Sequence, residues 1–258
     1  MDELDGRSCG DLVKDAPWLL AANDSLKVGE SLRLDPAEAR HVAGSLRRRS
    51  GDQVMLADGA GTVATVVIRI LGKGRVDAEV LAVRSHAAPT GGGVTLALAV
   101  IERQAMDWAV QKAVEVGIRR LIPVISERTQ VGARDYSKRV DHWRRIGMQA
   151  LKQCRRPWAM AVEEAVPLQT LVERESDRWG IVVADRNGST AENLPDEAGR
   201  VLVVGPEGGF TAAERELFDH FGWPGLRLGE HVLRAETAAI VGGAMLVARL
   251  EKRSTFKP

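Results

Sequence analysis

The sequence predicts an α/β protein of two domains, and three observations support this. After residue 93, apolar strands alternate with amphipathic helices, a pattern typical of a parallel sheet covered on both faces. Before residue 86 the signals are mainly strands and turns, which indicate a small β-barrel-like domain carrying one helix. Residues 86–93 between them are small residues, a proline and glycines, which predict a linker.

Composition sets outer limits on fold and function. The chain has 258 residues, of which 45% are hydrophobic and 28% charged, as in a globular protein with a core. A net charge of +1 neither requires nor excludes nucleic acid as a partner. Cys9 and Cys154 fit neither a disulfide framework nor a metal site, which favours a reducing cytoplasm. We expect no signal peptide and no membrane span.

The first domain is expected to span residues 21–85, after an N-terminal extension over residues 1–20 whose first 17 residues are partly disordered. Residues 35–49 predict its helix, with Asp35 as N-cap and Pro36 at the first position. Two strand-like runs within residues 52–70 flank Asp-Gly-Ala-Gly, which predicts a hairpin, and residues 74–83 predict a third strand.

The second domain is expected to span residues 94–258. Its expected strands are residues 94–101, 120–126, 159–165, 179–185, 201–204 and 226–228. Its expected helices are residues 106–117, 136–154 and 167–175, with a further helix after each of the last two strands.

Two glycine turns follow the last two expected strands. "VLVVGPEGGFTAAERELF" (residues 201–218) resembles a phosphate loop but contains no lysine, and Thr211 with Glu214 predicts a capping box. The second turn lies in "LRLGEHVLRAETAAIVGGAML" (residues 226–246). Ligands of open α/β sheets bind at the carboxyl ends of strands, so the two turns together predict one pocket. Taken alone, the first turn is equally consistent with a plain strand-to-helix connection.

Charge indicates the class of ligand. Glu207 and Glu236 would repel a polyphosphate and suit a neutral or cationic ligand with hydroxyl groups. S-adenosylmethionine fits this description. Whether Glu207 holds the loop together or touches the ligand is left open by the sequence.

The last helix predicts a partner. Residues 238–250 are apolar nearly all round, so this helix is buried on more than one side. We expect a homodimer in which Gly242 and Gly243 allow close approach of the second subunit; burial within one chain is the alternative.

Several motifs together resemble one known family. They are "GPEGGFT…E" (205–214), "LGEHVLRAETA" (228–238), "WAVQKAVEVGIRRLIPVISERT" (108–129), "QALKQCRR" (149–156) and "RHVAGSLRRRSGDQVMLADGAG" (40–61). In this order they resemble the RsmE family of ribosomal RNA methyltransferases, within the SPOUT superfamily, over almost the whole chain.

The resemblance implies a fold and an activity. The fold would be an N-terminal PUA-like β-barrel followed by a SPOUT domain with a trefoil knot, assembled as a homodimer. The activity would be methylation, by S-adenosylmethionine, of N3 of one uridine in 16S ribosomal RNA of the small ribosomal subunit. On matching positions, the cofactor-binding residues would be Ala184, Asp185, Val204, Gly205, Pro206, Glu207, Gly208, Gly209, Leu228, Gly229, Val232, Leu233, Arg234, Ala235, Glu236 and Thr237.

The chain departs from the family pattern at three places. Arg103 is the only cation where the family has a lysine and an arginine before the helix of residues 106–117. Glu230 and His231 replace the Pro-Arg that usually follows Gly229. Lys152 stands where an acidic residue is common.

Catalysis and RNA binding are assigned to arginines. Methyl transfer requires in-line positioning and loss of the uridine N3 proton, and an arginine can stabilise charge on the uracil carbonyls. Arg156 is the first candidate, with Arg234 and Arg103 as secondary ones; the alternatives are a solvated helix end for Arg156 and an ion pair with Glu236 for Arg234. No general base is evident apart from Glu207 as a candidate. The RNA-binding candidates are His41, Arg47, Arg48, Arg49, Arg103, Gln153 and Arg156. Cys154 is expected to be structural or substrate-lining.

Two other functions compete with this interpretation. A Rossmann-type nucleotide enzyme needs Gly-x-Gly-x-x-Gly after an early strand, but residues 94–101 lead into Glu102-Arg103-Gln104. A non-catalytic RNA-binding assembly factor would keep the basic N-terminal surface without needing paired glycine turns.

Overall fold

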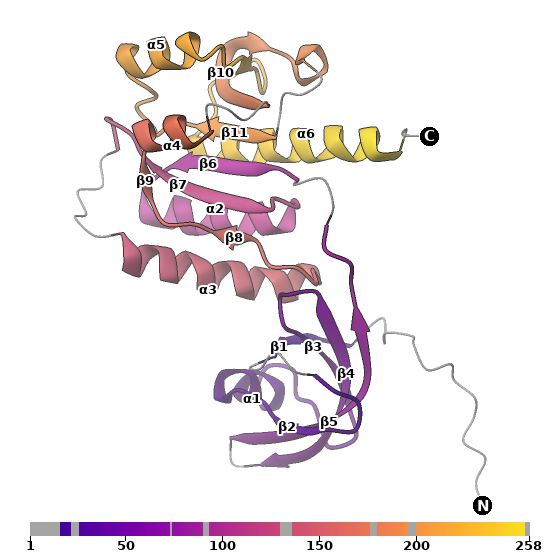
Figure 1. Ribbon diagram of the computed structural model, residues 1–258. Helices are drawn as coiled ribbons and strands as arrows, with labels where there is room; N and C mark the ends of the chain where they lie inside the picture. Colours follow the sequence, from indigo (N-terminus) through magenta and orange to yellow (C-terminus); the bar gives the residue numbers. More distant parts are fainter. Residues whose placement is uncertain are drawn as a thin grey trace, which may run out of the picture. The chain divides into compact units, whose positions relative to one another are not determined.

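The structure is a computed structural model that describes residues 16–21, 26–72, 74–89, 93–129, 136–175, 180–195 and 200–255, with side chains to residue 252. The chain divides into two compact units, each built around a sheet of its own (Figure 1). The first unit is Met1–Ala88 with Leu151–Ala159, and the second is Pro89–Ala150 with Met160–Pro258. The division after Ala88 lies inside the expected linker of residues 86–93.

The first unit is built on a five-stranded sheet with the order β1-β3-β4-β5-β2. Its strands are β1 (Trp18–Leu20), β2 (Ser31–Arg33), β3 (Gln53–Ala57), β4 (Thr62–Gly72) and β5 (Arg75–Ser85). β1 runs parallel to β3, and the other neighbours are antiparallel. The predicted hairpin is confirmed: Asp58 Oδ1 accepts the N–H groups of Ala60 and Thr62 at 2.7 and 2.9 Å, which closes the turn between β3 and β4.

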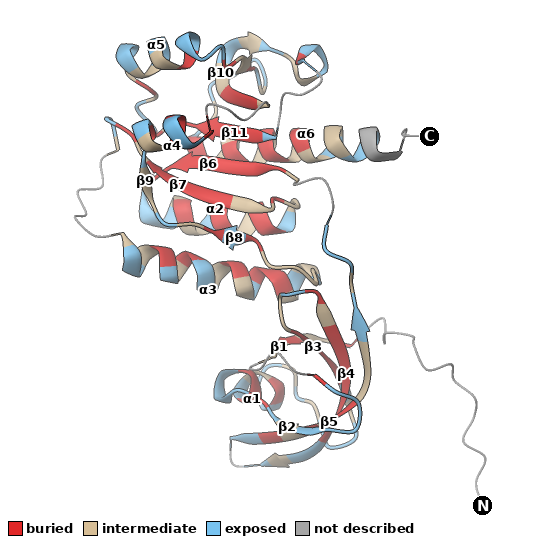
Figure 2. Cartoon of the chain, in the orientation of Figure 1, coloured by how far each residue is buried: buried red, intermediate tan, exposed pale blue. Residues whose placement is uncertain are grey.

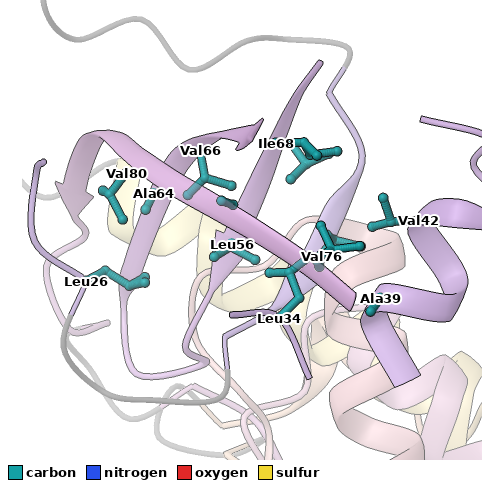
Figure 3. Packing of buried hydrophobic residues seen from close by; sticks show 13 residues of the cluster. Leu26, Leu34, Ala39, Val42, Leu56, Ala64, Val66, Ile68, Val76 and Val80 are labelled. Atoms are coloured by element: carbon teal, nitrogen blue, oxygen red, sulfur yellow. The ribbon is translucent and has the colours of Figure 1, made fainter. Parts of the chain in front are cut away.

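The core of this unit lies between the sheet and helix α1 (Pro36–Ala43). Figure 3 shows Ala39 and Val42 of α1 among the buried aliphatic side chains of the strands. Asp35 caps the helix as predicted, because its carboxylate accepts the Ala37 N–H at 2.7 Å. The predicted end at residue 49 is wrong. The chain turns back after Ala43, with Arg47 at φ 48°, so the basic segment of residues 47–49 is a loop.

The predicted end of the N-terminal extension, at residue 20, is wrong, because the first strand begins before it. Trp18–Leu20 form β1, and Leu19 is fully buried in the core. Parallel pairing with β3 therefore makes residues 18–20 part of the first unit. Residues 1–15, which include Cys9, lie outside the described residues.

Residues 151–159, which the sequence placed in the second domain, pack on the β3–β4 hairpin. The Gly61 N–H donates to the Pro157 carbonyl at 2.9 Å, and Trp158 Nε1 donates to the Ala87 carbonyl at 3.1 Å. A Cβ at Gly61 would lie 2.4 Å from the Trp158 ring, so only glycine fits beneath the indole. The first part of the expected strand 159–165 is accordingly not a strand, and β8 begins at Ala161.

The unusual Lys152 has a partner in this unit. Its Nζ lies 2.8 Å from Oε1 of Glu38 on α1, and both side chains are largely buried. A buried acid requires an opposite charge, so the structure accounts for a lysine at this position.

The second unit contains a parallel sheet with the order β12-β10-β11-β6-β7-β8, and β9 also pairs with β7. The strands are β6 (Thr95–Ala99), β7 (Arg120–Ile125), β8 (Ala161–Val162), β9 (Val166–Pro167), β10 (Ile181–Ser189), β11 (Val201–Val204) and β12 (Gly225–Leu226). The predicted parallel sheet is confirmed. The last expected strand, residues 226–228, is the shorter β12.

Helices cover both faces of this sheet. They are α2 (Arg103–Glu115), α3 (Ser137–Cys154), α4 (Leu168–Glu175), α5 (Ala212–His220) and α6 (Ala235–Thr255), with a short 3-10 helix η1 (Ala191–Asn193). Val201 and Val203 pack with apolar residues of α4 and α5, whereas Leu202, on the opposite face, meets α6. Figure 2 accordingly shows the central strands buried along their length. Among the described residues, no helix is long and apolar enough to cross a membrane.

Gly242 and Gly243 do not face outward as expected. A Cβ at Gly242 would lie 2.8 Å from Leu202, and one at Gly243 would lie 2.9 Å from Ile118. The two glycines therefore let α6 approach its own chain closely, and they carry no argument for a second subunit.

Candidate functional site

The first glycine turn, residues 205–211, forms what we call the glycine loop. It connects the end of β11 to α5 at the carboxyl edge of the sheet. A Cβ at Gly205 would lie 3.0 Å from the ring of Phe210, which folds back over the loop. Gly209 has φ +67°, and its N–H donates to the Pro206 carbonyl at 2.8 Å. The positive φ favours glycine at residue 209, and a Cβ at residue 205 would require the Phe210 ring to shift.

The predicted capping box at the start of α5 is confirmed. Thr211 Oγ1 accepts the Glu214 N–H at 3.3 Å, and Glu214 Oε2 accepts the Thr211 N–H at 2.8 Å. The end of the glycine loop is therefore fixed by the helix that follows it.

Glu207, whose role the sequence leaves open, holds the loop to a neighbouring strand end. Its Oε1 accepts the backbone N–H of Glu102, directly after β6, at 3.3 Å. Glu102 in turn caps α2, since its own carboxylate accepts N–H groups at 2.8 and 3.1 Å from Gln104 and Ala105. These bonds hold the pKa of the Glu102 carboxyl below its ordinary value.

The second turn, residues 227–234, forms what we call the second loop and connects β12 to α6. β12 does not neighbour β11, because β10 lies between them in the sheet. β10 and β12 approach so closely that a Cβ at Gly188 would lie 2.2 Å from the backbone of Gly225. The pocket predicted from two strand ends therefore involves three, and β10 contributes Ala184 and Asp185.

Two adjoining cavities lie between these loops, within the second unit. The larger, of about 340 Å³, is lined by Ala184, Val204, Gly205, Pro206, Glu207, Gly209, Phe210, Arg215, Val232, Leu233, Arg234, Ala235 and Ala238. The smaller, of about 190 Å³, is lined by Ala184, Asp185, Arg186, Arg215, Leu226, Leu228, Gly229, His231, Val232, Leu233 and Ala238. Most of the sequence-predicted cofactor residues are thus brought together around one space.

Three of those predicted residues do not line either cavity. Gly208 accepts a hydrogen bond from Arg128 through its carbonyl oxygen. Glu236 and Thr237 lie on the first turn of α6, behind Ala235. The ion pair with Glu236, which was the alternative role for Arg234, is present at 4.0 Å, and the Arg234 side chain is 86% exposed.

Several lining residues were missed by the sequence analysis, and Arg215 is the most informative. It lines both cavities, and its Nη1 donates to Asp185 Oδ2 at 2.9 Å. Arg215 follows Thr211 by one helical turn, a spacing that places it on the loop side of α5. The others are Arg186, Phe210, Leu226, His231 and Ala238.

The predicted RNA-binding and catalytic residues are divided between the two units. Arg103, exposed at the start of α2, and Arg234 belong to the second unit. The members in the first unit are His41, Arg47, Arg48, Arg49, Gln153 and Arg156. Arg47 and Arg49 are exposed, whereas Arg48 is half-buried with its Nε enclosed. The Cys154 thiol lies 3.6 Å from the Leu151 carbonyl oxygen of its own helix.

Among the described residues, no group of three or more His, Cys, Asp or Glu side chains could hold a metal ion. The lining consists of backbone, apolar side chains, arginines, His231 and the carboxylates of Asp185 and Glu207.

Comparison with known proteins identifies the family. The model of the RNA methyltransferase domain matches residues 89–247, beginning at the first residue of the second unit. Ribosomal RNA small subunit methyltransferase E of Mycobacterium tuberculosis (strain CDC 1551 / Oshkosh) is 32% identical over 218 residues, 81% of this chain and 82% of the relative. This chain belongs to the ribosomal RNA small subunit methyltransferase E family.

Two further comparisons extend over both units. The family member from Aquifex aeolicus is 28% identical over 213 residues, which are 82% of this chain and 92% of that protein. The crystal structure of ribosomal RNA small subunit methyltransferase E from Neisseria gonorrhoeae bound to S-adenosyl methionine superposes with a TM-score of 0.81 at 28% identity. The match covers 91% of this chain and 98% of the other, so the family likeness includes the first unit.

Proposed function

We propose that this chain is a methyltransferase that transfers the methyl group of S-adenosylmethionine to N3 of one uridine in 16S ribosomal RNA of the small ribosomal subunit. Family membership supports the reaction class, and the observation that carries the proposal is the pair of adjoining cavities between the glycine loop and the second loop. The two cavities share Ala184, Arg215, Val232, Leu233 and Ala238, so one bent ligand can occupy both.

The chemistry of the lining fits S-adenosylmethionine. Leu226, Leu228 and Val232 offer an apolar surface to the adenine ring, and the glycine loop allows backbone contact with the ligand. The carboxylates of Asp185 and Glu207 suit ribose hydroxyls and a sulfonium cation and would repel a polyphosphate. When bound, the cofactor supplies an electrophilic methyl group, and the residues of this chain bind and orient it.

Arg234 is the catalytic candidate that the second unit contributes. Its exposed guanidinium at the edge of the larger cavity can stabilise negative charge on the uracil carbonyls once the N3 proton leaves. Arg156, in the first unit, remains the other catalytic candidate. Glu207 is less suited to remove the proton, because its Oε1 already accepts the Glu102 N–H.

Cys154 is proposed to have no covalent role. Its thiol points at the carbonyl oxygen of Leu151, and a deprotonated N3 already has a lone pair for attack. The Cys154→Ser variant is therefore expected to retain most methyl transfer, measured as initial rate on isolated small subunits. Loss of nearly all activity in a folded variant would overturn this assignment.

RNA binding is proposed for the basic loop of residues 47–49 together with His41, Gln153, Arg156 and Arg103. Arg47 and Arg49 are exposed on that loop and can contact phosphates. We further propose that the first unit is a PUA-like barrel and that the protein acts in the cytoplasm.

A homodimer and a trefoil knot complete the proposal. Val241, Met245 and Ala248 recur at helical spacing on α6; the first two are half-buried and Ala248 is exposed, which supports burial by a second copy. The proposed knot rests on membership of the family alone. Sedimentation equilibrium tests the dimer.

The decisive experiment is transfer of labelled methyl groups to small subunits isolated from cells lacking the enzyme, followed by identification of the modified nucleoside. Recovery of N3-methyluridine supports the proposal, and a different methylated nucleoside refutes the choice of atom. Calorimetry with S-adenosylmethionine is the companion test. Binding of RNA without any binding of this ligand would favour a non-catalytic assembly factor.

A further inference from the structure

The glycine loop is held from outside by the loops that follow two other strands. In the sheet, β11 neighbours β6, and β6 neighbours β7. Glu102 follows β6 and donates its N–H to Glu207. Residues 126–129, which we call the clamp loop, follow β7 and contact the glycine loop and the start of α5.

Arg128 of the clamp loop makes the shortest of these contacts. Its Nη1 donates to the Gly208 carbonyl oxygen at 2.7 Å. Its side-chain stem lies against the same residue, because a Cβ at Gly208 would be 3.4 Å from Arg128 Cδ. A charged donor on a backbone carbonyl makes a stronger hydrogen bond than a neutral one.

Glu127 ties the clamp loop to the capping box. Its backbone N–H donates to Glu214 Oε1 at 2.9 Å, while its own Oε2 accepts the Thr211 hydroxyl at 3.1 Å. The clamp loop is itself closed, because the N–H groups of Ser126 and Thr129 donate to Thr129 Oγ1 and the Ser126 carbonyl, respectively, at 3.0 and 3.1 Å. Arg128 therefore reaches the Gly208 carbonyl from a turn that is closed by its own hydrogen bonds.

We infer that Arg128 is a positioning residue for the cofactor wall, an inference that rests on the proposed function. The peptide unit between Gly208 and Gly209 is flanked by two glycines, which offer the least resistance to rotation. Arg128 holds the carbonyl end of this unit, and the Pro206 carbonyl holds its N–H end at 2.8 Å. With both ends bonded, the peptide keeps one orientation, and Gly205, Glu207 and Gly209 keep their place in the cavity wall.

The competing role for Arg128 is contact with RNA, because the residue is exposed. The two roles differ in what is lost with the side chain. A positioning residue affects the order of the glycine loop and the affinity for S-adenosylmethionine. A phosphate contact instead affects the affinity for RNA and its dependence on salt.

The test compares Arg128→Ala and Arg128→Lys with Arg174→Ala in the full-length protein. Arg174 is a matched control, because its guanidinium makes a hydrogen bond of similar length, 2.8 Å to Glu163, and lines neither cavity. Amide hydrogen exchange at Gly209, without ligand, is expected to be roughly tenfold faster in Arg128→Ala, as for loss of a charged hydrogen bond. Lysine should restore part of the protection, and the control should match wild type.

Calorimetry and subunit binding complete the test. The dissociation constant for S-adenosylmethionine is expected to rise roughly tenfold in Arg128→Ala, with unchanged affinity for small subunits in its absence. Unchanged Gly209 exchange in Arg128→Ala would overturn the inference, as would a loss confined to subunit affinity. A wild-type protein that binds no S-adenosylmethionine would refute the proposed function, while the exchange measurement would still decide the role of Arg128 in the loop.

Discussion

The two loops that line the cavities differ in how they are held. The glycine loop is bonded to Glu102 after β6, to Arg128 after β7, and to its own helix through the capping box. The second loop is bonded at its start, where the Arg227 N–H donates to the Ser189 carbonyl at 2.8 Å. Further along it, Glu230, His231 and Val232 are exposed, and Val232 is 77% accessible. At its end, Arg234 forms an ion pair with Glu236 at 4.0 Å.

The site thus combines the glycine loop, which is held in place, with the second loop, which can adjust to a ligand. A loop whose backbone is bonded on several sides loses little conformational entropy when a ligand binds. A loop with exposed apolar side chains gains contacts only when a ligand or partner covers it. We therefore expect substitutions in the glycine loop or at its supports to change stability as well as binding, and substitutions of exposed residues in the second loop to change binding with little effect on stability.

The largest effect is expected at the β10–β12 crossing that leads into the second loop. In Gly188→Ala the new Cβ would lie 2.2 Å from the Gly225 backbone, and backbone cannot move aside as a side chain can. We expect a loss of about 3 kcal/mol in the free energy of unfolding, measured with urea. Gly229→Ala is the control, since nothing lies within 4 Å of its Cβ position. Equal stability of the two variants would show that the crossing is not tightly packed.

A smaller loss of stability is expected at the capping box. Thr211→Ala removes the acceptor for the Glu214 N–H and the donor to Glu127. The free energy of unfolding should fall by about 1 kcal/mol, and Thr211→Ser should retain most of it because the hydroxyl remains. If serine is as destabilising as alanine, the methyl group rather than the hydroxyl is what matters.

The support at Glu102 should make stability depend on pH. Hydrogen bonds from Gln104, then Ala105, lower the pKa of this carboxyl in the folded state below its ordinary value of 4.5. The stabilisation of the folded state by the ionised Glu102 carboxyl is therefore complete above the pKa that this group has in the unfolded chain. It is lost as the pH falls through the lower pKa that the group has in the folded state. The stability difference between wild type and Glu102→Gln should shrink over that acidic range. A difference that stays constant with pH would contradict this.

The smallest effect on stability is expected at Val232. Because this side chain is mostly exposed, Val232→Ala should change the free energy of unfolding by less than about 0.5 kcal/mol. Its dissociation constant for S-adenosylmethionine should nevertheless rise by roughly threefold to tenfold, because the methyl groups line both cavities. Unchanged affinity would remove Val232 from the binding surface.

Local signals were sufficient for much of the fold. Asp35 and Thr211 were predicted as N-caps because capping depends on a side chain and on backbone a few residues away. The parallel sheet followed from apolar strands alternating with helices. The end of α1 was missed because the arginines after Ala43 are compatible with a helix, whereas the chain leaves the helix at Gly44 and Arg47 adopts φ 48°.

Less of the site was predictable, because it depends on which strands become neighbours. The sequence identified both glycine turns and proposed one pocket between them. It could not show that β10 separates β11 from β12, or that Arg128 and Arg215 reach the glycine loop and Asp185. Such contacts join residues 80 and 30 positions apart, respectively, and no local pattern specifies them.

Residue type and short spacing were enough to establish the family pattern, the two glycine turns and the caps that begin the helices. The role of Glu207, the inward placement of Gly242 and Gly243, and the support of the glycine loop by Arg128 were decided by the tertiary structure. The physical reason is the same in each case. A side chain's hydrogen-bond partner or packing neighbour is fixed only when distant strands and helices are brought together.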